Sequence, residues 1–158
     1  MREIDELEPR EGKYWNGTYK DIGYRVQLWT SKDFNGELNY IWNYYIYINL
    51  KNLSPDVAKR LWLRAKLPKL GKNFKRKLYR YYDEPLLNNI EMHGGITWYK
   101  KMYSISDEKV IEIGCDFNHD GDNYDEYDLR LVLSDVKNCI DTLPPELLAN
   151  QSNKKVER

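Results

Sequence analysis

Alternating side chains run from Glu37 to Leu50, the most regular pattern in the sequence. A period of two is typical of a β-strand, whose successive side chains point to opposite faces of a sheet. One expected face is wholly aromatic or aliphatic: Leu38, Tyr40, Trp42, Tyr44, Ile46, Ile48 and Leu50. The other mixes amides with apolar residues: Asn39, Ile41, Asn43, Tyr45, Tyr47 and Asn49. We predict that this strand is central in its sheet or bent.

Further strands are expected on both sides of this one. Tyr14 to Tyr19 predicts a short strand, and Tyr24 to Thr30 alternates well. Between them and the long strand, Asn35-Gly36 is a signal for a hairpin turn. Later in the chain, Ile96 to Tyr103 and Val110 to Asp116 predict a second hairpin.

Two helices are predicted by capping residues that precede apolar positions three and four residues apart. Ser54, Pro55 and Asp56 supply an N-cap, a first-turn proline and a first-turn acid. The apolar face that follows comprises Val57, Ala58, Leu61, Trp62 and Ala65. Ser134 is the expected cap of the second helix, and Pro144-Pro145 its expected end. Its apolar face comprises Val136, Cys139, Ile140 and Leu143.

These elements predict a single α+β domain over residues 14–148, with an antiparallel, aromatic-rich sheet and about two packed helices. The chain has 158 residues, enough for a sizeable core. Its apolar content comes largely from 14 Tyr, 5 Trp and 3 Phe, which are ordinary in β-rich proteins. Residues 1–13 are expected to form a flexible lead-in, and residues 149–158 a disordered polar tail.

Composition narrows the class of protein. Lys+Arg and Asp+Glu are equal at 25 each, which makes a duplex-DNA-coating protein improbable, since such proteins are usually strongly basic. The sequence contains no run of about 18 apolar residues, the length that would predict a membrane span. Met1 to Arg10 is acidic and lacks the apolar stretch of a signal peptide. Cys115 and Cys139 are expected to be buried free thiols in a reducing, cytoplasmic setting.

Charge is unevenly distributed along the chain. Lys59 to Arg80 contains ten Lys/Arg and no acid, whereas Asp83 to Asp128 contains twelve Asp/Glu and three Lys. This pattern fits two solvated faces, or a basic stretch that attracts phosphate or an acidic partner. Within the basic stretch, Lys75, Arg76 and Tyr79 are candidates to hold a nucleotide by charge and stacking. The alternative is a loop or strand whose rings pack inward.

Two polar segments carry the candidate chemistry. The first is His93 to Trp98, which includes Gly94, Gly95 and Thr97. The second is Gly114 to Asp122, which follows an apolar alternating run and includes Asp116, His119 and Asp122. A strand that ends in such a cluster points side chains out of a rigid sheet edge, where sites tend to be built.

The second segment has the spacing of a calcium loop, in which alternate oxygens converge on the ion. Position 12 of that loop should be Glu and is Tyr127, and the segment follows a strand rather than a helix, so an EF-hand is disfavoured. Another divalent metal ion stays open as a cofactor, with ligands His93, Asp116, His119 and Asp122. The alternative is that each histidine caps a turn.

Other chemistry has less support. A catalytic Cys115 is disfavoured, because the neighbouring Asp116 raises a thiol pKa and the alternation points Cys115 to the buried face. Gly94-Gly95 permits positive φ and a close approach to a ligand, or else a bulge or tight turn. Thr97 could offer a hydroxyl.

Together the two segments resemble a signature of small, mostly uncharacterised phage and prophage proteins. That signature runs His-Gly-Gly, then Leu or Ile, then Thr and an aromatic residue, and after a gap Gly-x-Asp-x-x-His-x-Gly-Asp. The residues that land on it are His93, Gly94, Gly95, Thr97, Gly114, Asp116, His119, Gly121 and Asp122. The match covers about 30 residues, and Tyr79 to Asn89 replaces the Pro-rich stretch that usually precedes it. The resemblance implies a phage-associated protein of small α+β fold.

Three functions follow from these features. In the first, an accessory or counter-defence protein of a phage or mobile element binds a small phosphate-bearing, nucleotide-like ligand at the polar end of the hairpin. In the second, a metal-dependent hydrolase cleaves a phosphoester through His93, Asp116, His119 and Asp122. In the third, the protein inhibits a host defence protein through its charged faces. Ligand identity and oligomeric state are not predicted.

Overall fold

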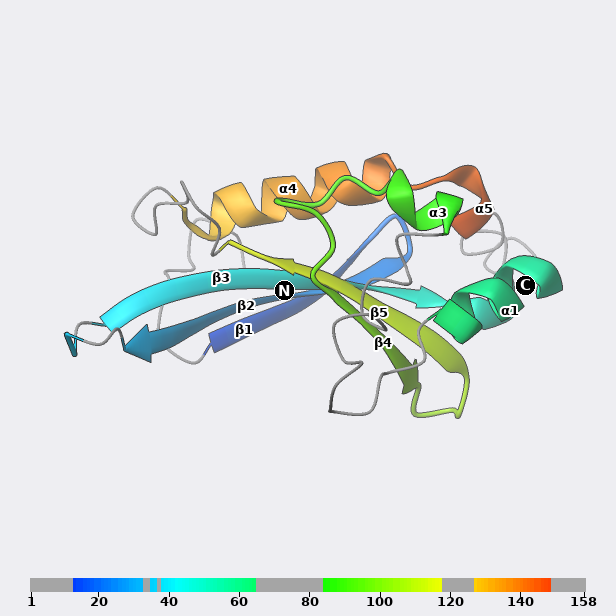
Figure 1. The fold of residues 1–158 in the computed structure, drawn as a ribbon, viewed down its shortest axis with the longest axis horizontal. Coiled ribbons are helices and arrows are strands. Elements are labelled where there is room, and N and C mark those ends of the chain that lie inside the picture. The colour runs from blue at the N-terminus through cyan, green and yellow to red at the C-terminus, as the bar shows by residue number, and fades with distance from the viewer. Residues whose placement is uncertain (1–12, 33–34, 37, 65–83, 118–126, 149–158) are drawn as a thin grey trace, which may run out of the picture.

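A computed structural model describes residues 13–32, 35–36, 38–64, 84–117 and 127–148 of the chain. Five antiparallel strands form one sheet, and helices lie over one of its faces (Figure 1). This confirms the predicted α+β fold with an antiparallel, aromatic-rich sheet.

The strands are β1 (Lys13–Tyr19), β2 (Ile22–Lys32), β3 (Leu38–Asn49), β4 (Trp98–Tyr103) and β5 (Lys109–Asp116). Their order in the sheet is β1-β2-β3-β5-β4, so β3 is central, as its two-faced pattern predicted. The first three strands form a meander, and the β4–β5 hairpin joins it through pairing of β5 with β3.

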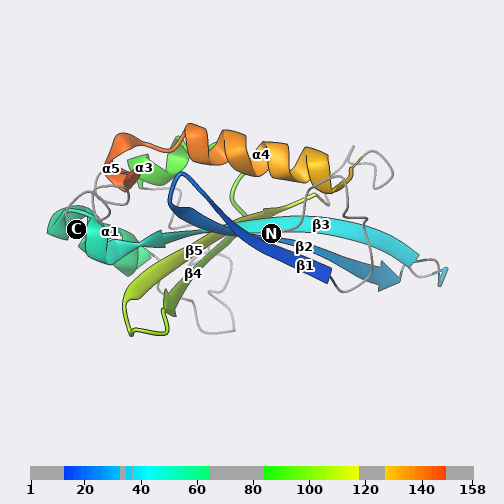
Figure 2. The same cartoon turned by 180° about the vertical axis from the view of Figure 1, so that it is seen from behind.

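The helices are η2 (Leu50–Asn52), α1 (Pro55–Arg64), α3 (Pro85–Asn88), α4 (Leu129–Asp141) and α5 (Pro145–Leu148). Figure 2 shows α4 lying along the sheet, with α3 and α5 near its C-terminal end and α1 beside the sheet. None of the helices in the described ranges is long and apolar enough to cross a membrane.

Helix α4 begins earlier than its sequence signals suggested. Its N-cap is Asp128, whose Oδ1 accepts a hydrogen bond of 2.9 Å from the Leu131 backbone N–H. The prediction that Ser134 caps this helix is therefore wrong, because Ser134 lies exposed in its interior. The apolar stripe extends back through Leu129 and Val132, whose burial against the sheet stabilises the additional first turn.

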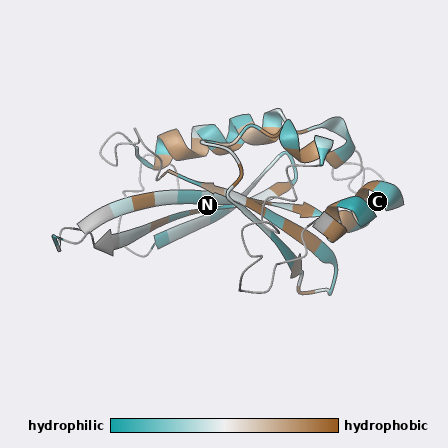
Figure 3. Ribbon diagram, viewed as in Figure 1, coloured by the Kyte–Doolittle hydropathy of each residue, from teal (hydrophilic) through white to brown (hydrophobic). Residues whose placement is uncertain are grey.

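The core forms between α4 and one face of the sheet. Polar and apolar residues alternate around α4 and along the strands, so each element turns its apolar side inward (Figure 3). The α4 side chains that are buried are Leu129, Val132, Leu133, Val136, Cys139 and Ile140. The sheet side chains buried in the core include Val26, Leu28, Trp42, Tyr44, Ile46, Ile48, Ile111, Ile113 and Cys115. We call this the inner face, and the opposite one the outer face.

Helix α1 is tied to the hairpin and to the chain before α3. As predicted, Ser54 caps it, with its Oγ accepting from the Val57 N–H at 3.3 Å. The Tyr99 hydroxyl donates to the Leu61 carbonyl at 2.8 Å, which links β4 to the helix. On the other side, Arg60 forms an ion pair with the buried Glu84. These contacts fix α1 on the inner face, over the β4–β5 side of the sheet.

Both cysteines are free and buried, as expected from the sequence. Burial raises the pKa of the Cys115 thiol well above its usual value and that of Cys139 to about 12. The fully buried Tyr44 lies between them, and its hydroxyl donates to Asp135 Oδ2 at 2.6 Å. A thiol held protonated in this way is a poor nucleophile.

We expect the buried thiols to make the protein less stable at alkaline pH. Because the pKa of Cys139 is raised from 9.0 to about 12, its contribution is fully present below pH 9 and lost as the pH rises towards 12. Denaturant unfolding of the wild type and of Cys139→Ala between pH 7 and pH 11 measures this effect. The wild type should lose stability more steeply with pH; parallel curves would contradict the assignment.

Candidate functional site

The β4–β5 hairpin brings the two polar segments together at one end of the sheet. The Thr97 backbone N–H donates to the Gly114 carbonyl at 2.9 Å, which extends the ladder past the start of β4. The Thr97 Oγ1 lies 3.5 Å from Asp116 Oδ2. The His93 ring stacks on Phe117, with 4.0 Å between ring centroids and 9° between ring planes. The structure thus gathers His93, Thr97 and Asp116 at one sheet end.

The segment before β4 turns through two glycines. Gly94 and Gly95 have φ of 69° and 90°, in the left-handed region that favours glycine. The Gly95 N–H donates to the Met92 carbonyl at 2.9 Å and closes the turn. A Cβ on Gly95 would meet no atom within 4 Å, so backbone conformation alone requires the glycine.

His93 packs with the core rather than on the outer face. Its stacking partner Phe117 is buried and lies near Tyr44, with 6.3 Å between their ring centroids. Tyr127 meets both rings edge-on, at 5.5 Å from His93 and 4.8 Å from Phe117. Asp116, one residue before Phe117, pairs in register with Asn43 on the outer face. The end of β5 therefore separates His93 from Asp116.

The strand register decides which side chains meet on the outer face. One cross-strand row runs through Trp98, Gly114, Tyr45, Arg25 and Asn16. A neighbouring row runs through Asp116, Asn43, Gln27 and Tyr14. A third joins Lys100, Glu112 and Tyr47. Residues far apart in the sequence thus meet beside the Thr97–Asp116 pair.

Gly114 makes room for an aromatic contact in the first row. A Cβ on Gly114 would lie 2.4 Å from Tyr45 Cδ1 and 2.9 Å from the Tyr44 carbonyl oxygen. The Tyr45 ring therefore lies across the glycine, where it meets Trp98 edge-on, with 6.2 Å between ring centroids. A side chain at position 114 would displace Tyr45 and leave Trp98 without this support.

Trp98 is a partly exposed indole held in one orientation. Its ring nitrogen donates to Glu112 Oε1 at 2.6 Å, and the edge contact with Tyr45 supports the ring on one side. The Lys100 ammonium lies 5.8 Å from the centre of the ring. The residue is nevertheless 42% exposed. A fixed aromatic surface that faces solvent suits stacking of a planar ligand.

Two tyrosines beside Trp98 are neutral hydrogen-bonding groups. Burial raises the pKa of Tyr45 and of Tyr47, and the Glu112 carboxylate raises both further. The Tyr45 hydroxyl oxygen accepts from Asn43 Nδ2 at 2.6 Å. Both phenols therefore stay protonated at neutral pH, while Glu112 and Asp116 supply acceptor oxygens.

Asn43 carries a buried acceptor without a partner. The residue is only 8% exposed, and within the described residues no atom donates a hydrogen bond to its Oδ1. An unpaired buried polar atom costs about 1–3 kcal/mol, so such atoms are rare in folded proteins. Its position next to Asp116, in the row beside Trp98, places this unmet acceptor at the centre of the polar group.

We call Asn43, Tyr45, Tyr47, Thr97, Trp98, Glu112 and Asp116 the outer-face cluster. It combines an exposed planar ring, two carboxylates, an amide and three hydroxyls. Arg25 adds a positive charge nearby, with its Nε donating to Asn16 Oδ1 at 3.0 Å and its guanidinium 4.9 Å from the Tyr14 ring centre. Such a surface can stack a ring and accept hydrogen bonds from its amino or hydroxyl groups.

Of the ten residues predicted for the site, Thr97 and Asp116 belong to this cluster, and half are not described by the structure. Lys75, Arg76, Tyr79, His119 and Asp122 all lie outside the described residues. Within the described ranges, no group of three or more His, Cys, Asp or Glu side chains could hold a metal ion.

The sequence did not single out Asn43, Tyr45, Trp98 or Glu112 as functional residues. The alternation had placed Asn43 and Tyr45 on one face of the central strand, which was a usable signal. Their meeting with Trp98 and Glu112 depends on which strands pair and in what register. Local sequence patterns do not specify that register across 50 or more intervening residues.

Comparisons of the chain with protein-family models, with curated proteins and with solved structures find no match. The geometry of the outer-face cluster therefore carries the functional argument.

Gly114→Ala should destabilise the protein by about 1–3 kcal/mol, because the added methyl group collides with the Tyr45 ring and the Tyr44 carbonyl. Gly23→Ala is the matched control in β2, since a Cβ there lies 3.8 Å from Tyr47, at ordinary contact distance. Urea unfolding of both variants measures the difference. Equal stability of the two variants would contradict the close packing of Tyr45 on Gly114.

His93→Ala should lower the free energy of unfolding by about 1–3 kcal/mol, because it removes a ring stacked on Phe117 and in contact with Tyr127. Thr97→Ala removes only an exposed hydroxyl and should cost less than about 0.5 kcal/mol. Denaturant unfolding compares the two. A His93→Ala variant as stable as the wild type would show that the stack contributes nothing.

Proposed function

We propose that this chain binds a small phosphate-bearing, nucleotide-like ligand at the outer-face cluster. The orphaned Oδ1 of Asn43 is the observation that carries the proposal. A free protein gains nothing from a buried acceptor that lacks a donor, whereas an amino or hydroxyl group of a ligand would satisfy it.

A nucleobase would stack on the exposed side of Trp98. The Glu112 and Tyr45 contacts hold this ring in place before any ligand arrives, so little side-chain entropy is lost on binding. Stacking of a base on an aromatic side chain is worth about 1–3 kcal/mol. The exposed indole therefore supplies both affinity and orientation.

The polar groups around Trp98 suit the other parts of a nucleotide. Asp116 and Asn43 offer oxygens to ribose hydroxyls or to a base amino group. Lys100 and Arg25 offer positive charge for a phosphate on the same face. The basic segment with Lys75, Arg76 and Tyr79 is expected to add charge and stacking, and its part in the site stays a prediction.

The biological setting is proposed from the resemblance of the two polar segments to small phage and prophage proteins. In that setting the protein acts in the host bacterial cytoplasm as an accessory or counter-defence factor of a phage or mobile element. Holding a nucleotide-like ligand in the outer-face cluster would be the act by which it interferes with the host.

Calorimetric titration with a panel of linear and cyclic nucleotides tests the proposal. We expect one class to bind, and Trp98→Ala to weaken it by about tenfold or more through loss of stacking. Trp29→Ala is the control, since Trp29 is 40% exposed on the same face but four residues along β2 from the row that contains Trp98. It should change the affinity less than about twofold. Equal losses in both variants would contradict the site.

Asn43→Val gives an independent readout at the same site. The change removes the orphaned acceptor and also the hydrogen bond that Asn43 Nδ2 donates to the Tyr45 hydroxyl, so the free protein should stay within about 1 kcal/mol of the wild type. The same change should weaken the binding of the nucleotide by about tenfold, because one hydrogen bond from the ligand is lost. A variant that loses stability and keeps its affinity would show that Asn43 serves only the fold.

Metal analysis of the purified protein decides the hydrolase alternative. Stoichiometric Zn, Mn or Fe that disappears in His119→Ala would replace the binding proposal with a metal-dependent phosphoester hydrolase. Protein without metal that still binds a nucleotide supports the binding function.

A further inference from the structure

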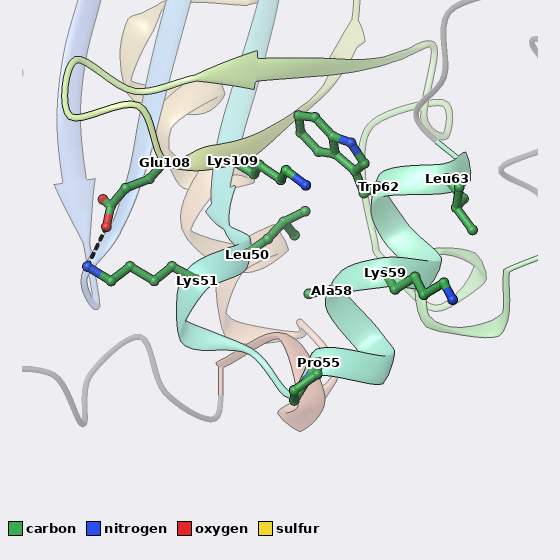
Figure 4. A pocket seen from close by; sticks show the side chains of 9 residues that line it. All are labelled: Leu50, Lys51, Pro55, Ala58, Lys59, Trp62, Leu63, Glu108 and Lys109. Carbon is green, nitrogen blue, oxygen red and sulfur yellow. Dashed lines mark ion pairs between the residues drawn. The ribbon is translucent and has the colours of Figure 1, made fainter.

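A cleft lies between α1 and the turn end of the β4–β5 hairpin (Figure 4). It has a cavity volume of about 440 Å³, and its floor is apolar, formed by Leu50, Ala58 and Trp62. Among the described lining residues, Lys51, Lys59 and Lys109 lie around it, and Glu108 is the one acid. The cleft is on the inner-face side of the hairpin, so it is distinct from the outer-face cluster.

Trp62 is the aromatic residue that lines the cleft. Its ring meets Tyr103 edge-on, with 5.5 Å between ring centroids. The ammonium groups of Lys101 and Lys109 lie 4.5 and 5.1 Å from the centre of the same ring. Ammonium groups held against one indole favour a carboxylate beside this ring.

The Glu108 carboxylate at the cleft is paired with a lysine. Glu108 Oε2 lies 2.7 Å from the Lys51 ammonium, and Glu108 Oε1 accepts from Asn49 Nδ2 at 3.1 Å. Figure 4 shows this ion pair at one side of the cleft, away from Lys59 and Leu63. With Glu108 and Lys51 paired, Lys59 and Lys109 leave the lining with a net positive charge.

Exposed apolar side chains extend beyond the cleft. Leu63 on α1 is 61% exposed and Tyr103 on β4 is 59% exposed. Ile105, in the turn between β4 and β5, is fully exposed. Exposed apolar side chains beside a cleft are typical of protein–protein contacts.

We propose that this cleft docks an acidic segment of a partner protein. One large apolar side chain of the segment enters beside Trp62, and its flanking carboxylates face Lys59, Lys101 and Lys109. The apolar anchor supplies most of the affinity, while the charges set the orientation and the choice of partner. The proposal goes beyond nucleotide binding and holds whether or not the outer-face cluster takes a ligand.

Fluorescence polarisation with a labelled synthetic peptide tests the proposal on the full chain. The probe places glutamates around a central Leu-Trp pair, and we expect saturable binding. Lys109→Glu should weaken it by about tenfold or more, because it reverses the charge of a lysine that lines the cleft 5.1 Å from the centre of the Trp62 ring. Lys137→Glu is the matched control: this exposed lysine on α4 lies 5.7 Å from the Tyr19 ring centre, away from the cleft. It should change the affinity less than about twofold.

Two control peptides separate the contribution of the apolar pair from that of the acidic residues. Replacing the Leu-Trp pair by serines should abolish binding, and so should replacing the glutamates by lysines. Binding of the lysine peptide as tight as that of the acidic one would overturn the proposal, as would equal effects of Lys109→Glu and Lys137→Glu.

Two further measurements test other occupants of the cleft. If decanoate binds at the cleft and the acidic peptide does not, a small anionic amphiphile is the ligand. If Lys109→Glu dissociates a dimer in solution, the cleft is an interface between copies.

Discussion

Pairing of β3 with β2 on one side and with β5 on the other is the constraint on which the remaining structure depends. The register sets Tyr44 beside Val26 and Cys115 on the inner face, and it sets Asn43 beside Gln27 and Asp116 on the outer face. Because side chains alternate along a strand, a slip of one residue would exchange the two faces. The core under α4 would then meet asparagines, and the outer-face cluster would not exist.

The outer face shows how a sheet can hold polar groups at a cost in stability. Because Gly114 has no side chain, the Tyr45 ring can lie across it and support Trp98. Asn43 keeps a buried oxygen that nothing in the described chain satisfies. The unpaired Asn43 oxygen does not improve the fold, since a paired amide would stabilise it more. Such local losses are typical of residues retained for binding.

The two proposed surfaces use the same hairpin in different ways. Trp98 begins β4 on the outer face, and Tyr103 ends it on the inner face beside α1. In each place a tryptophan lies near a lysine, but the neighbours differ. Carboxylates and an amide surround Trp98 and suit a small ligand with donors, whereas lysines and apolar residues surround Trp62 and suit an acidic segment. A single rigid hairpin therefore positions both surfaces.

The sequence by itself determined the fold class, the central strand, the hairpin and the capped start of α1, because each depends on local periodicity or on a capping residue. It also indicated that the segments around His93 and Asp116 would meet, since a hairpin joins them. It misplaced the start of α4, because burial of Leu129 and Val132 against the sheet outweighs the cap offered by Ser134. Only the tertiary structure decided that His93 packs on Phe117 while Asp116 lies beside Asn43 on the outer face. Those contacts follow from strand register and helix placement, which long-range packing sets and neighbouring residues do not.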